Sequence, residues 1–346
     1  MKYPHFWTGK KGQGLAILLA PLGKLVCLVA QRRHRRAQAG RGVTRLPVPV
    51  VVVGNITVGG TGKTPLLISL IGHLRKAGWT PGVISRGYGG KPGADPLVLD
   101  ARTGVDRVGD EPLMIWQRTG VPVSVHPDRV RAGQALLTTH PQCDVIISDD
   151  GLQHYQLGRD YEIAVIDRLR GIGNGRCLPA GPLREPVSRL NSVDAVVVNE
   201  PVGHTADQEG QLAPVPESSA PRYVMQLQAR CLRRLSDQER IWLNRLPASK
   251  VHAVAGIGNP ARFFSTLARL GLDVIPHAFP DHHVFSRREL DFARDPEAVV
   301  VMTEKDAVKW PSDDRDFNLS NHYVLEVDAH IPQALIDQLL ARLDSL

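Results

Sequence analysis

One segment near the N-terminus constrains the fold of this chain more than any other feature. A run of valines, Val48–Val53, leads into a glycine-rich turn that ends in Lys63 and Thr64, and a helical pattern follows over Pro65–Ala77. A strand, a glycine-rich turn and a helix N-terminus in this order form a P-loop, in which backbone N–H groups converge on phosphate oxygens. The lysine of such a loop contacts the β- and γ-phosphates, and the hydroxyl after it binds Mg²⁺. The sequence therefore predicts a nucleotide site.

The turn departs from the common P-loop pattern at one position. Its first glycine is replaced by Thr57, and flexibility comes from the glycines closer to the helix. The predicted phosphate-binding residues are Thr57, Gly59, Gly60, Thr61, Gly62, Lys63 and Thr64. A glycine-rich strand-to-helix turn that arose by chance would not be expected to place Gly-Lys-Thr at the head of the helix.

Two adjacent carboxylates follow another apolar run. The strand predicted over Asp144–Ser148 ends in Asp149 and Asp150. In P-loop proteins an acid at the end of such a strand lies near the metal ion. Adjacent acids also cap helices or lie in solvated turns, but their place after a buried strand favours a link to the metal.

Short β-branched runs alternate with helical patterns from residue 46 onward, which is typical of a parallel sheet covered by helices on both faces. The predicted strands are Val48–Val53, Gly82–Ser85, Val121–Val125, Asp144–Ser148, Glu162–Ile166, Ala195–Val198, Val251–Ala255, Val274–Ala278, Ala298–Met302 and Val324–Val327. A stretch rich in Pro, Gly, Ser and acids at 201–221 interrupts the alternation. We predict an α/β fold with a P-loop NTPase-like parallel sheet in residues 46–222 and a second, smaller α/β domain in residues 223–346.

The first 45 residues hold much of the positive charge. They contain ten Lys and Arg and no acid, a formal +10, whereas the whole chain carries +7, which leaves the remainder at −3. A protein that wraps nucleic acid would be basic throughout, so we expect no nucleic-acid partner.

Leucines and valines recur at three- and four-residue steps between Lys11 and Gln31, as on one face of a helix. The apolar run Leu15–Ala30 is shorter than the roughly 20 residues that span a bilayer, and four arginines follow within Arg32–Arg36. Two interpretations stay open. Residues 1–45 form a membrane-associated helix at an anionic surface, or the leucines pack on the body while the arginines face water.

The four cysteines are far apart in the chain and include no CxxC pair. This spacing predicts no zinc ribbon, no redox dithiol and no disulfide framework. It favours a reducing compartment.

Short motifs rich in glycine, acids and histidine extend from the P-loop to the C-terminal third of the chain. They are Gly59-Gly-Thr-Gly-Lys-Thr-Pro65, Ser85-Arg-Gly-Tyr-Gly-Gly90, Gly109-Asp-Glu-Pro112, Ser148-Asp-Asp-Gly-Leu-Gln-His154, Gly173-Asn-Gly175, Leu178-Pro-Ala-Gly-Pro-Leu-Arg-Glu-Pro186, Phe279-Pro-Asp-His-His283 and Thr303-Glu-Lys-Asp306. Each motif is weak alone, but in this order they make the chain closely similar to the tetraacyldisaccharide 4'-kinases, the lipid A 4'-kinases of Gram-negative bacteria.

The resemblance implies an ATP- and Mg²⁺-dependent kinase that phosphorylates the 4'-hydroxyl of a tetraacylated glucosamine disaccharide 1-phosphate, the lipid A precursor. It also implies two α/β/α domains that can close over the active site. The N-terminal helix would anchor the enzyme at the cytoplasmic face of the bacterial inner membrane, against its anionic leaflet.

The resemblance also assigns a base dyad. Its members here are Asp110 and His282, and a histidine beside a carboxylate is held in one tautomer. His283 is adjacent, but we prefer His282 because it directly follows Asp281. One partner of the dyad would accept the proton of the sugar hydroxyl.

Further residues of these motifs receive roles in the nucleotide and substrate sites. Lys63 would hold the β- and γ-phosphates, and Arg86 and Arg184 could meet phosphate. The predicted metal-linked residues are Thr64, Asp149, Asp150, Glu111 and Glu185. Lys305 and Asp306 follow a predicted strand, where a ligand site is expected, and either base contact or domain closure fits them.

Two other functions fit parts of the sequence. A P-loop GTPase would read guanine with an Asn/Thr-Lys-x-Asp segment, but in Thr303-Glu-Lys-Asp306 the lysine is one place late. A membrane adaptor with a vestigial P-loop is disfavoured because the lysine, the hydroxyl, the tandem acids and the dyad occur together.

Overall fold

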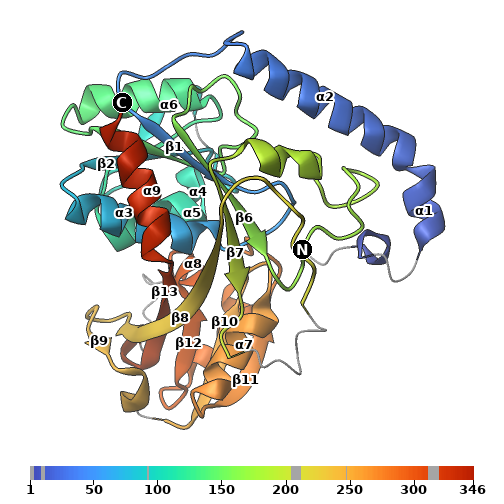
Figure 1. Ribbon diagram of the computed structural model, residues 1–346. Helices are drawn as coiled ribbons and strands as arrows, with labels where there is room; N and C mark the ends of the chain where they lie inside the picture. The colour runs from blue at the N-terminus through green and yellow to red at the C-terminus, as the bar shows by residue number, and fades with distance from the viewer. Residues whose placement is uncertain (1–3, 9–11, 92, 204–211, 247, 311–318) are drawn as a thin grey trace.

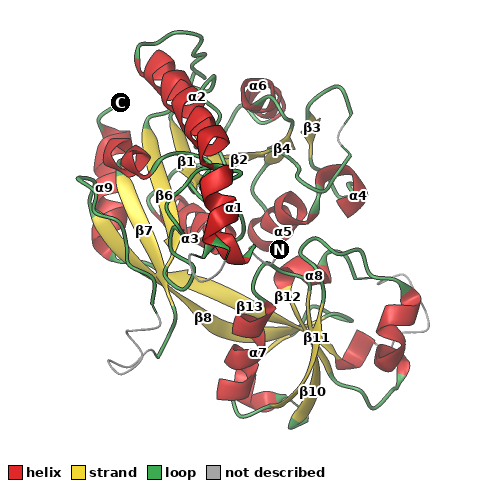
Figure 2. Cartoon of the chain, turned by 90° about the vertical axis from the view of Figure 1, so that its right-hand side faces the viewer, coloured by secondary structure: helices red, strands yellow, loops and turns green. Residues whose placement is uncertain are grey.

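The computed structural model describes residues 4–8, 12–91, 93–203, 212–246, 248–310 and 319–346. Within these residues one 13-stranded sheet runs through the molecule, with helices on both of its faces (Figures 1 and 2). The strands are β1 Val50–Gly54, β2 Pro81–Ser85, β3 Leu97–Val98, β4 Val123–Val125, β5 Val145–Asp149, β6 Tyr161–Asp167, β7 Ala195–Glu200, β8 Arg222–Arg234, β9 Arg240–Ile241, β10 Lys250–Ala255, β11 Asp273–Ala278, β12 Val300–Thr303 and β13 His322–His330. The helices are α1 Gln13–Leu18, α2 Ala20–Gln38, α3 Lys63–Lys76, α4 Val105–Val108, α5 Asp110–Thr119, α6 Arg129–Thr139, α7 Pro260–Arg269, α8 Glu304–Ala307 and α9 Gln333–Asp344.

Each of the ten strands predicted from the sequence overlaps an observed strand, and the prediction of a mixed α/β fold built on a parallel-dominated sheet is confirmed. The main path of the sheet has the order β11-β10-β12-β13-β8-β7-β6-β1-β5-β2-β4-β3. Strands β7 to β4 along this path are parallel, and so are β11 to β13. The carboxyl ends of β1 and β5, its neighbour, therefore meet at one edge, where the P-loop and the tandem acids lie.

The sequence did not predict the long strand β8, which joins the two halves of the sheet. β8 pairs parallel with β7 through its first residues and antiparallel with β13 along most of its length. The sheet is therefore continuous across the predicted boundary at residues 222 and 223. The other strands were predicted from runs of apolar residues. β8, from Arg222 to Arg234, has no such run because polar and charged residues interrupt it.

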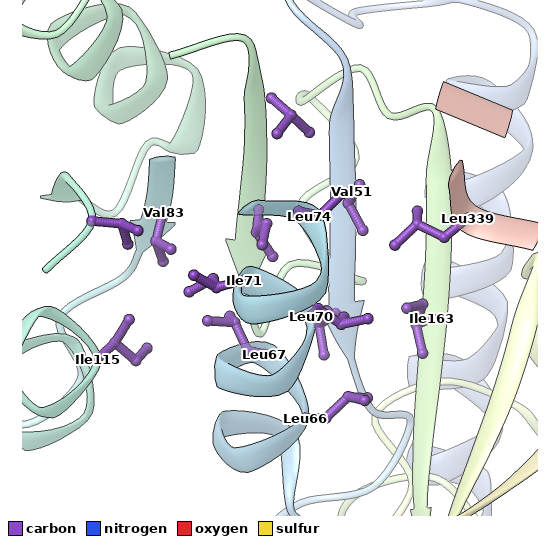
Figure 3. Close-up of a cluster of buried hydrophobic side chains, with 14 of the residues drawn as sticks. Val51, Leu66, Leu67, Leu70, Ile71, Leu74, Val83, Ile115, Ile163 and Leu339 are labelled. Atoms are coloured by element: carbon purple, nitrogen blue, oxygen red, sulfur yellow. The ribbon is translucent and has the colours of Figure 1, made fainter. Parts of the chain in front are cut away.

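Helix α3, which follows the P-loop, is fixed against the sheet by an apolar face. It buries five aliphatic side chains at helical spacing, Leu66, Leu67, Leu70, Ile71 and Leu74. They pack among strand residues such as Val51, Val83 and Ile163, with Leu339 of α9 on the same face (Figure 3). Burying one such side chain contributes about 1.5–3 kcal/mol. The N-terminus of α3 is thus held rigidly at the edge of the sheet.

The leucine stripe of the N-terminal helices faces solvent. Its members Leu15, Leu18, Leu22, Leu25 and Val29 are between 43 and 74% exposed. The opposite side of α2 contacts the body, where Gly23 approaches the carbonyl oxygen of Cys177 so closely that a Cβ would lie 2.8 Å from it. Leu19 and Val26 of the same stripe are half-buried, and Val26 packs against the body. Packing of the stripe as a whole on the body, one of the two interpretations of this segment, is therefore wrong. Of the helices that the structure describes, none is long and apolar enough to cross a bilayer.

The cysteines correct another expectation. Cys27 of α2 and Cys177 form a disulfide, although they are 150 residues apart, whereas Cys143 and Cys231 are free and buried. The prediction of no disulfide is therefore wrong for one pair. It rested on spacing along the chain, which carries no information about two cysteines that meet only because α2 packs on the body.

Candidate active site

The P-loop connects β1 to α3 and is held from outside by β7. Gly62 caps α3 with a φ of 95°, and a Cβ there would lie 2.5 Å from the side-chain nitrogen of Asn199. That nitrogen donates to the carbonyl oxygen of Thr61 at 3.0 Å. Gly62 is therefore required both by its backbone conformation and by the close approach of Asn199. The sequence analysis did not single out Asn199, because its position beside the loop depends on the pairing of β6 and β7.

Lys63 points toward the acids at the end of the neighbouring strand. Its Nζ lies 3.2 Å from Oδ1 of Asn55 and 3.5 Å from Oδ1 of Asp150. Asn55 also donates to Thr57 Oγ1 and to the carbonyl oxygen of Gly59, both at 3.3 Å. Asn55 therefore links the predicted lysine to the turn that precedes it. Sequence reasoning missed Asn55 as well, although its place directly after β1 was a usable signal.

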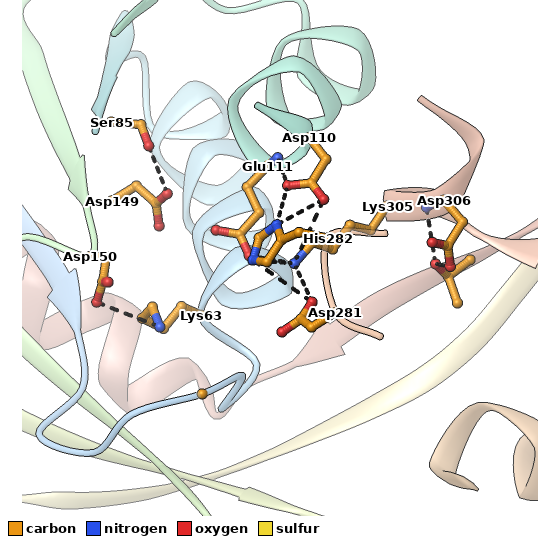
Figure 4. A network of polar contacts seen from close by, with 12 residues as sticks. Lys63, Ser85, Asp110, Glu111, Asp149, Asp150, Asp281, His282, Lys305 and Asp306 are labelled. Carbon is orange, nitrogen blue, oxygen red and sulfur yellow. Dashed lines mark hydrogen bonds and ion pairs between the residues drawn. The ribbon is translucent and has the colours of Figure 1, made fainter. Parts of the chain in front are cut away.

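The two tandem acids occupy different environments (Figure 4). Asp149 ends β5, is 1% exposed, and accepts a hydrogen bond from Ser85 Oγ at 3.1 Å. Burial, with smaller contributions from Glu111 and Asp150, raises the pKa of Asp149 to about 7. Its Oδ1 has no hydrogen-bond partner among the described residues. A buried oxygen without a partner, aimed beside the P-loop, suits a cation.

Asp150 is ionised by its neighbours. Burial opposes its charge, but Lys63 and Arg184 outweigh burial and lower the pKa of Asp150 well below its usual range. Arg184 Nη1 lies 2.9 Å from Asp150 Oδ2. The backbone of Asp150 has a φ of 48°, a conformation that residues other than glycine adopt at some energetic cost and that is common at functional sites.

These side chains fit a magnesium ion bound together with a nucleotide. Mg²⁺ prefers hard oxygen ligands and is commonly bound by one or two carboxylates with substrate phosphates and water. Thr64 and Asp149 supply a hydroxyl and a free carboxylate oxygen beside the P-loop. Among the described residues no group of three or more His, Cys, Asp or Glu is arranged to hold a metal by itself.

Asp110 and His282 meet although they are 172 residues apart. Nδ1 of His282 lies 3.0 Å from both carboxylate oxygens of Asp110. Asp110 opens α5 and is 3% exposed. Burial opposes its charge, but the hydrogen bond from His282 and the nearby Lys305 lower the pKa of Asp110. His283 lies elsewhere, with its Nε2 3.1 Å from both oxygens of Glu289.

Gly109 sets the position of Asp110. It has a φ of 83°, and a Cβ there would lie 2.2 Å from the carbonyl oxygen of Tyr88. The ring of Tyr88 in turn lies 4.9 Å from that of His282. The glycine of the Gly109-Asp-Glu-Pro112 motif therefore lets the loop after β2 pack against the start of α5, next to the dyad.

We expect Gly109→Ala to lower both stability and turnover. Gly120→Ala is the matched control, because Gly120 ends the same helix with a φ of 67° but a Cβ there would meet nothing within 4 Å. The control should cost only the left-handed backbone penalty of about 1–2 kcal/mol and leave turnover intact. Gly109→Ala should cost more in urea unfolding and lower turnover about 100-fold through displacement of Asp110. Equal losses in both variants would contradict this role.

The other predicted site residues lie around these two groups. Glu111 pairs with Lys305 Nζ at 3.0 Å. Glu185 is buried and accepts a hydrogen bond from Gln153 Nε2 at 2.7 Å. The same nitrogen donates at 3.1 Å to the carbonyl oxygen of Asn55, so Gln153 links Glu185 to the start of the P-loop. Burial raises the pKa of Glu185. Arg86 is exposed at the start of the loop after β2.

The fold and this site together define a P-loop phosphotransferase. A family model described as tetraacyldisaccharide-1-P 4'-kinase matches residues 15–344. The chain therefore belongs to the tetraacyldisaccharide 4'-kinase family, as its motifs predicted, and is a kinase.

Relatives and a solved structure agree with this assignment. The tetraacyldisaccharide 4'-kinase of Pseudomonas syringae pv. syringae is 48% identical over 338 residues, which cover 96% of each chain. That of Pseudomonas fluorescens is 50% identical over 321 residues, which cover 92% of this chain and 89% of the relative. LpxK from Aquifex aeolicus, solved in complex with ATP, is 28% identical with a TM-score of 0.77 and covers 95% of this chain and 99% of its own.

Proposed function

We propose that this kinase transfers the γ-phosphoryl group of ATP to the 4'-hydroxyl of a tetraacyl glucosamine disaccharide 1-phosphate, with Asp110 as the base and His282 as its partner. The observation that carries the proposal is the convergence of a P-loop lysine, two tandem acids and the pair of buried Asp110 with half-buried His282 (Figure 4). Phosphoryl transfer needs positioning, charge neutralisation and a proton acceptor, and these residues supply each of the three.

The nucleotide end of the site belongs to the P-loop. Lys63 would contact the β- and γ-phosphates, and the N–H groups from Gly59 to Thr64 would point at phosphate oxygens. Thr64, Asp149 and Asp150 would hold Mg²⁺ directly or through water. When bound, Mg²⁺ neutralises the charge that develops on the transferred group. Glu111 and Glu185 would act on this set from a distance, since Lys305 and Gln153 already occupy them.

The acceptor end belongs to Asp110. As the 4'-hydroxyl attacks, its proton would pass to a carboxylate oxygen of Asp110, while the N–H at Nδ1 of His282 keeps that carboxylate in place. His282 has a φ of 60°, so the turn that carries it is held in a conformation that its neighbours must stabilise. Arg184 and Arg86 would meet phosphate groups of the two substrates.

Incubation of the purified protein with γ-labelled ATP and the disaccharide 1-phosphate tests the function directly. Transfer of the label to the 4' position is the expected result. An arm with GTP in place of ATP tests the alternative of a GTPase. GTP preference without label on the lipid would overturn the assignment of the acceptor.

Residues from both halves of the chain build the dyad. Asp110 lies in residues 46–222 and His282 in residues 223–346, which we take as the P-loop kinase domain and the smaller C-terminal domain. The acceptor hydroxyl would therefore react where the two parts meet. The two parts also approach each other at the P-loop. A Cβ added to Gly258 would lie only 3.5 Å from the backbone nitrogen of Gly60, which supports this proposal.

We further propose that residues 1–45 dock the enzyme on the anionic cytoplasmic leaflet of the bacterial inner membrane. The exposed apolar stripe on α1 and α2 supports this proposal, because large apolar patches on a soluble surface are uncommon. Arg32, Arg33, Arg35 and Arg36 are exposed at the end of α2. Each basic residue near an anionic surface contributes about 1 kcal/mol. The lipid substrate would then be reached in the plane of the membrane.

Replacing Leu18, Leu22 and Leu25 together by Ser should lower binding to phosphatidylglycerol vesicles at least about 100-fold, because each buried leucine contributes about 1.5–3 kcal/mol. Flotation of full-length protein with vesicles measures the loss. Binding by the unaltered protein should also weaken as salt rises. The triple Ser replacement should leave turnover on a detergent-dispersed acceptor unchanged. Undiminished vesicle binding by the variant would show that the stripe is not the anchor.

A further inference from the structure

Lys305 occupies the centre of a charged cluster that joins the two halves of the chain. Its Nζ lies 3.0 Å from Glu111 Oε1, 2.9 Å from Asp281 Oδ1 and 3.3 Å from His282 Nε2. An ammonium has three N–H groups, and these three contacts use all of them. Burial opposes the charge of Lys305, but Glu111, Asp110 and Asp281 outweigh it and raise the pKa of Lys305. Lys305 is therefore a fixed, fully charged donor beside the dyad (Figure 4).

We propose that Lys305 is a positioning residue for the phosphoryl transfer: by donating to Nε2 of His282 and to Glu111 it orients the ring that faces Asp110 and ties the turn that carries His282 to helix α5. The proposal rests on the base dyad of Asp110 and His282 proposed above. It assigns a role to the Thr303-Glu-Lys-Asp306 motif, for which base contact and domain closure were both open.

The first step of the argument concerns the tautomer of His282. An ammonium carries no lone pair, so in the contact between Lys305 and Nε2 the imidazole nitrogen must accept. The ring N–H then lies on Nδ1, where it is donated to Asp110. Lys305 therefore selects the tautomer in which Nδ1 of His282 faces Asp110 as a donor.

Lys305 acts on Asp110 through His282 and does not itself bond to the base. Its Nζ is shared with Asp281 and Glu111 and lies 3.9 Å from Oδ2 of Asp110. The other groups that face His282 are Asp281, whose Oδ1 lies 3.8 Å from Nε2, and the ring of Tyr88. The Nζ of Lys309 also lies near the base, 3.8 Å from Oδ2 of Asp110.

The second step concerns helix α5, which α8 holds at two points. Lys305 contacts Glu111 in the first turn of α5, and its neighbour Glu304 lies 3.3 Å from Arg118 in the last turn. Seven residues separate Glu111 from Arg118, so both lie on one face of the helix about two turns apart. Two consecutive residues of the motif therefore fix both ends of the helix that begins with Asp110.

The motif is itself anchored in the C-terminal half. Thr303 caps α8, and Asp306 is fully buried, with Oδ2 accepting from Gly256 N at 2.9 Å and from Thr303 Oγ1 at 2.6 Å. Arg118 also pairs with Glu326 and Asp328 on β13. α8 thus joins the C-terminal half to α5, the helix that begins with Asp110.

Lys305→Met tests the proposal in the full-length enzyme. We expect kcat to fall about 100-fold, as for other displacements of a reacting group, with the KM for ATP changed by less than about threefold. Lys305→Arg should recover most of the loss, because a guanidinium can still donate to Glu111 and Asp281. Lys250→Met is the matched control: it removes an exposed lysine from β10 of the same half and should leave kcat unchanged.

A second measurement reports on His282 whether or not the dyad catalyses the reaction. In protein labelled with ¹⁵N-histidine, the ring nitrogens of His282 are identified by their loss in His282→Gln. We expect the ring proton of the neutral tautomer on Nδ1 in the unaltered protein, and on Nε2 in part of the Lys305→Met molecules, where Nε2 can turn to Asp281. If the Met variant does not fold, Lys305→Gln replaces it.

These readouts separate the two proposals. Unchanged Nε2 protonation together with near-normal kcat in Lys305→Met would overturn the role of Lys305. A kcat loss that Lys305→Arg does not reduce, with Nε2 unchanged, would show a merely structural ion pair and would also overturn it. Suppose that Nε2 becomes protonated in Lys305→Met while this variant and Asp110→Asn both keep normal turnover. The contact between Lys305 and His282 would then stand, but the dyad on which its catalytic role depends would be removed.

Discussion

Asp110→Asn should lower kcat about 100- to 10,000-fold while ATP still binds, because the amide keeps the shape of the carboxylate but cannot accept the proton of the 4'-hydroxyl. Asp110 is buried at the start of α5, and its two oxygens lie 3.0 Å from Nδ1 of His282. Steady-state transfer of label from ATP to the lipid measures kcat, and titration with a fluorescent ATP analogue measures binding.

The adjacent histidines provide a control for this experiment. His282→Ala should lose much of the turnover, whereas His283→Ala should stay within a few-fold of the unaltered enzyme, since His283 pairs with Glu289 and stacks on Phe279 at 5.0 Å. Near-normal turnover in Asp110→Asn would remove Asp110 as the base. A larger loss of turnover in His283→Ala than in His282→Ala would show that His283, and not His282, is the partner of Asp110.

Much of the nucleotide end of the site could be predicted because it is local in sequence. β1, the turn and α3 follow one another within 27 residues, from Val50 to Lys76, and their order already implies their geometry. The tandem acids were placed by the same logic, because Asp149 ends a strand that neighbours β1 in a parallel sheet. What local sequence could not supply was Asn199, which reaches Thr61 from the end of β7.

The acceptor end depends on contacts between distant segments. No pattern in the residues around Asp110 indicates that His282 lies 3.0 Å away, and their pairing was predicted only from the resemblance to a family. The position of Lys305 shows the limit more clearly. Its three contacts come from Glu111 of α5 and from Asp281 and His282 in the turn after β11, segments that lie far apart in the chain.

β8 and the disulfide escaped prediction for related reasons. β8 mixes apolar with polar and charged residues along its length, and Arg233 of β8, like Arg240 of β9, pairs with Glu326 of β13. The pairing of Cys27 with Cys177 follows from the close approach of Gly23 to the loop at residue 177. Both features are products of tertiary packing, which spacing along the chain does not encode.

Lys63→Met should impair the other end of the site, with a loss of kcat/KM of about 100- to 1,000-fold, as expected when one preorganised donor to developing charge is removed. Unlike Asp110→Asn, this variant should also bind ATP more weakly, because Lys63 would contact the phosphates in the ground state as well as in the transition state. Its Nζ lies 3.5 Å from Asp150, so the substitution also removes the cation that most lowers the pKa of that carboxylate.

Lys76→Met is the control, since Lys76 is exposed in the last turn of the same helix, at the end opposite to the P-loop. Isothermal titration with ATP and Mg²⁺ separates the three proteins. If the site is divided as proposed, Lys63→Met loses nucleotide affinity and turnover together, Asp110→Asn loses turnover alone, and Lys76→Met loses neither. Unaltered ATP affinity and kcat/KM in Lys63→Met would mean that the P-loop lysine does not hold the nucleotide, and the division of the site into a phosphate end and an acceptor end would fail with it.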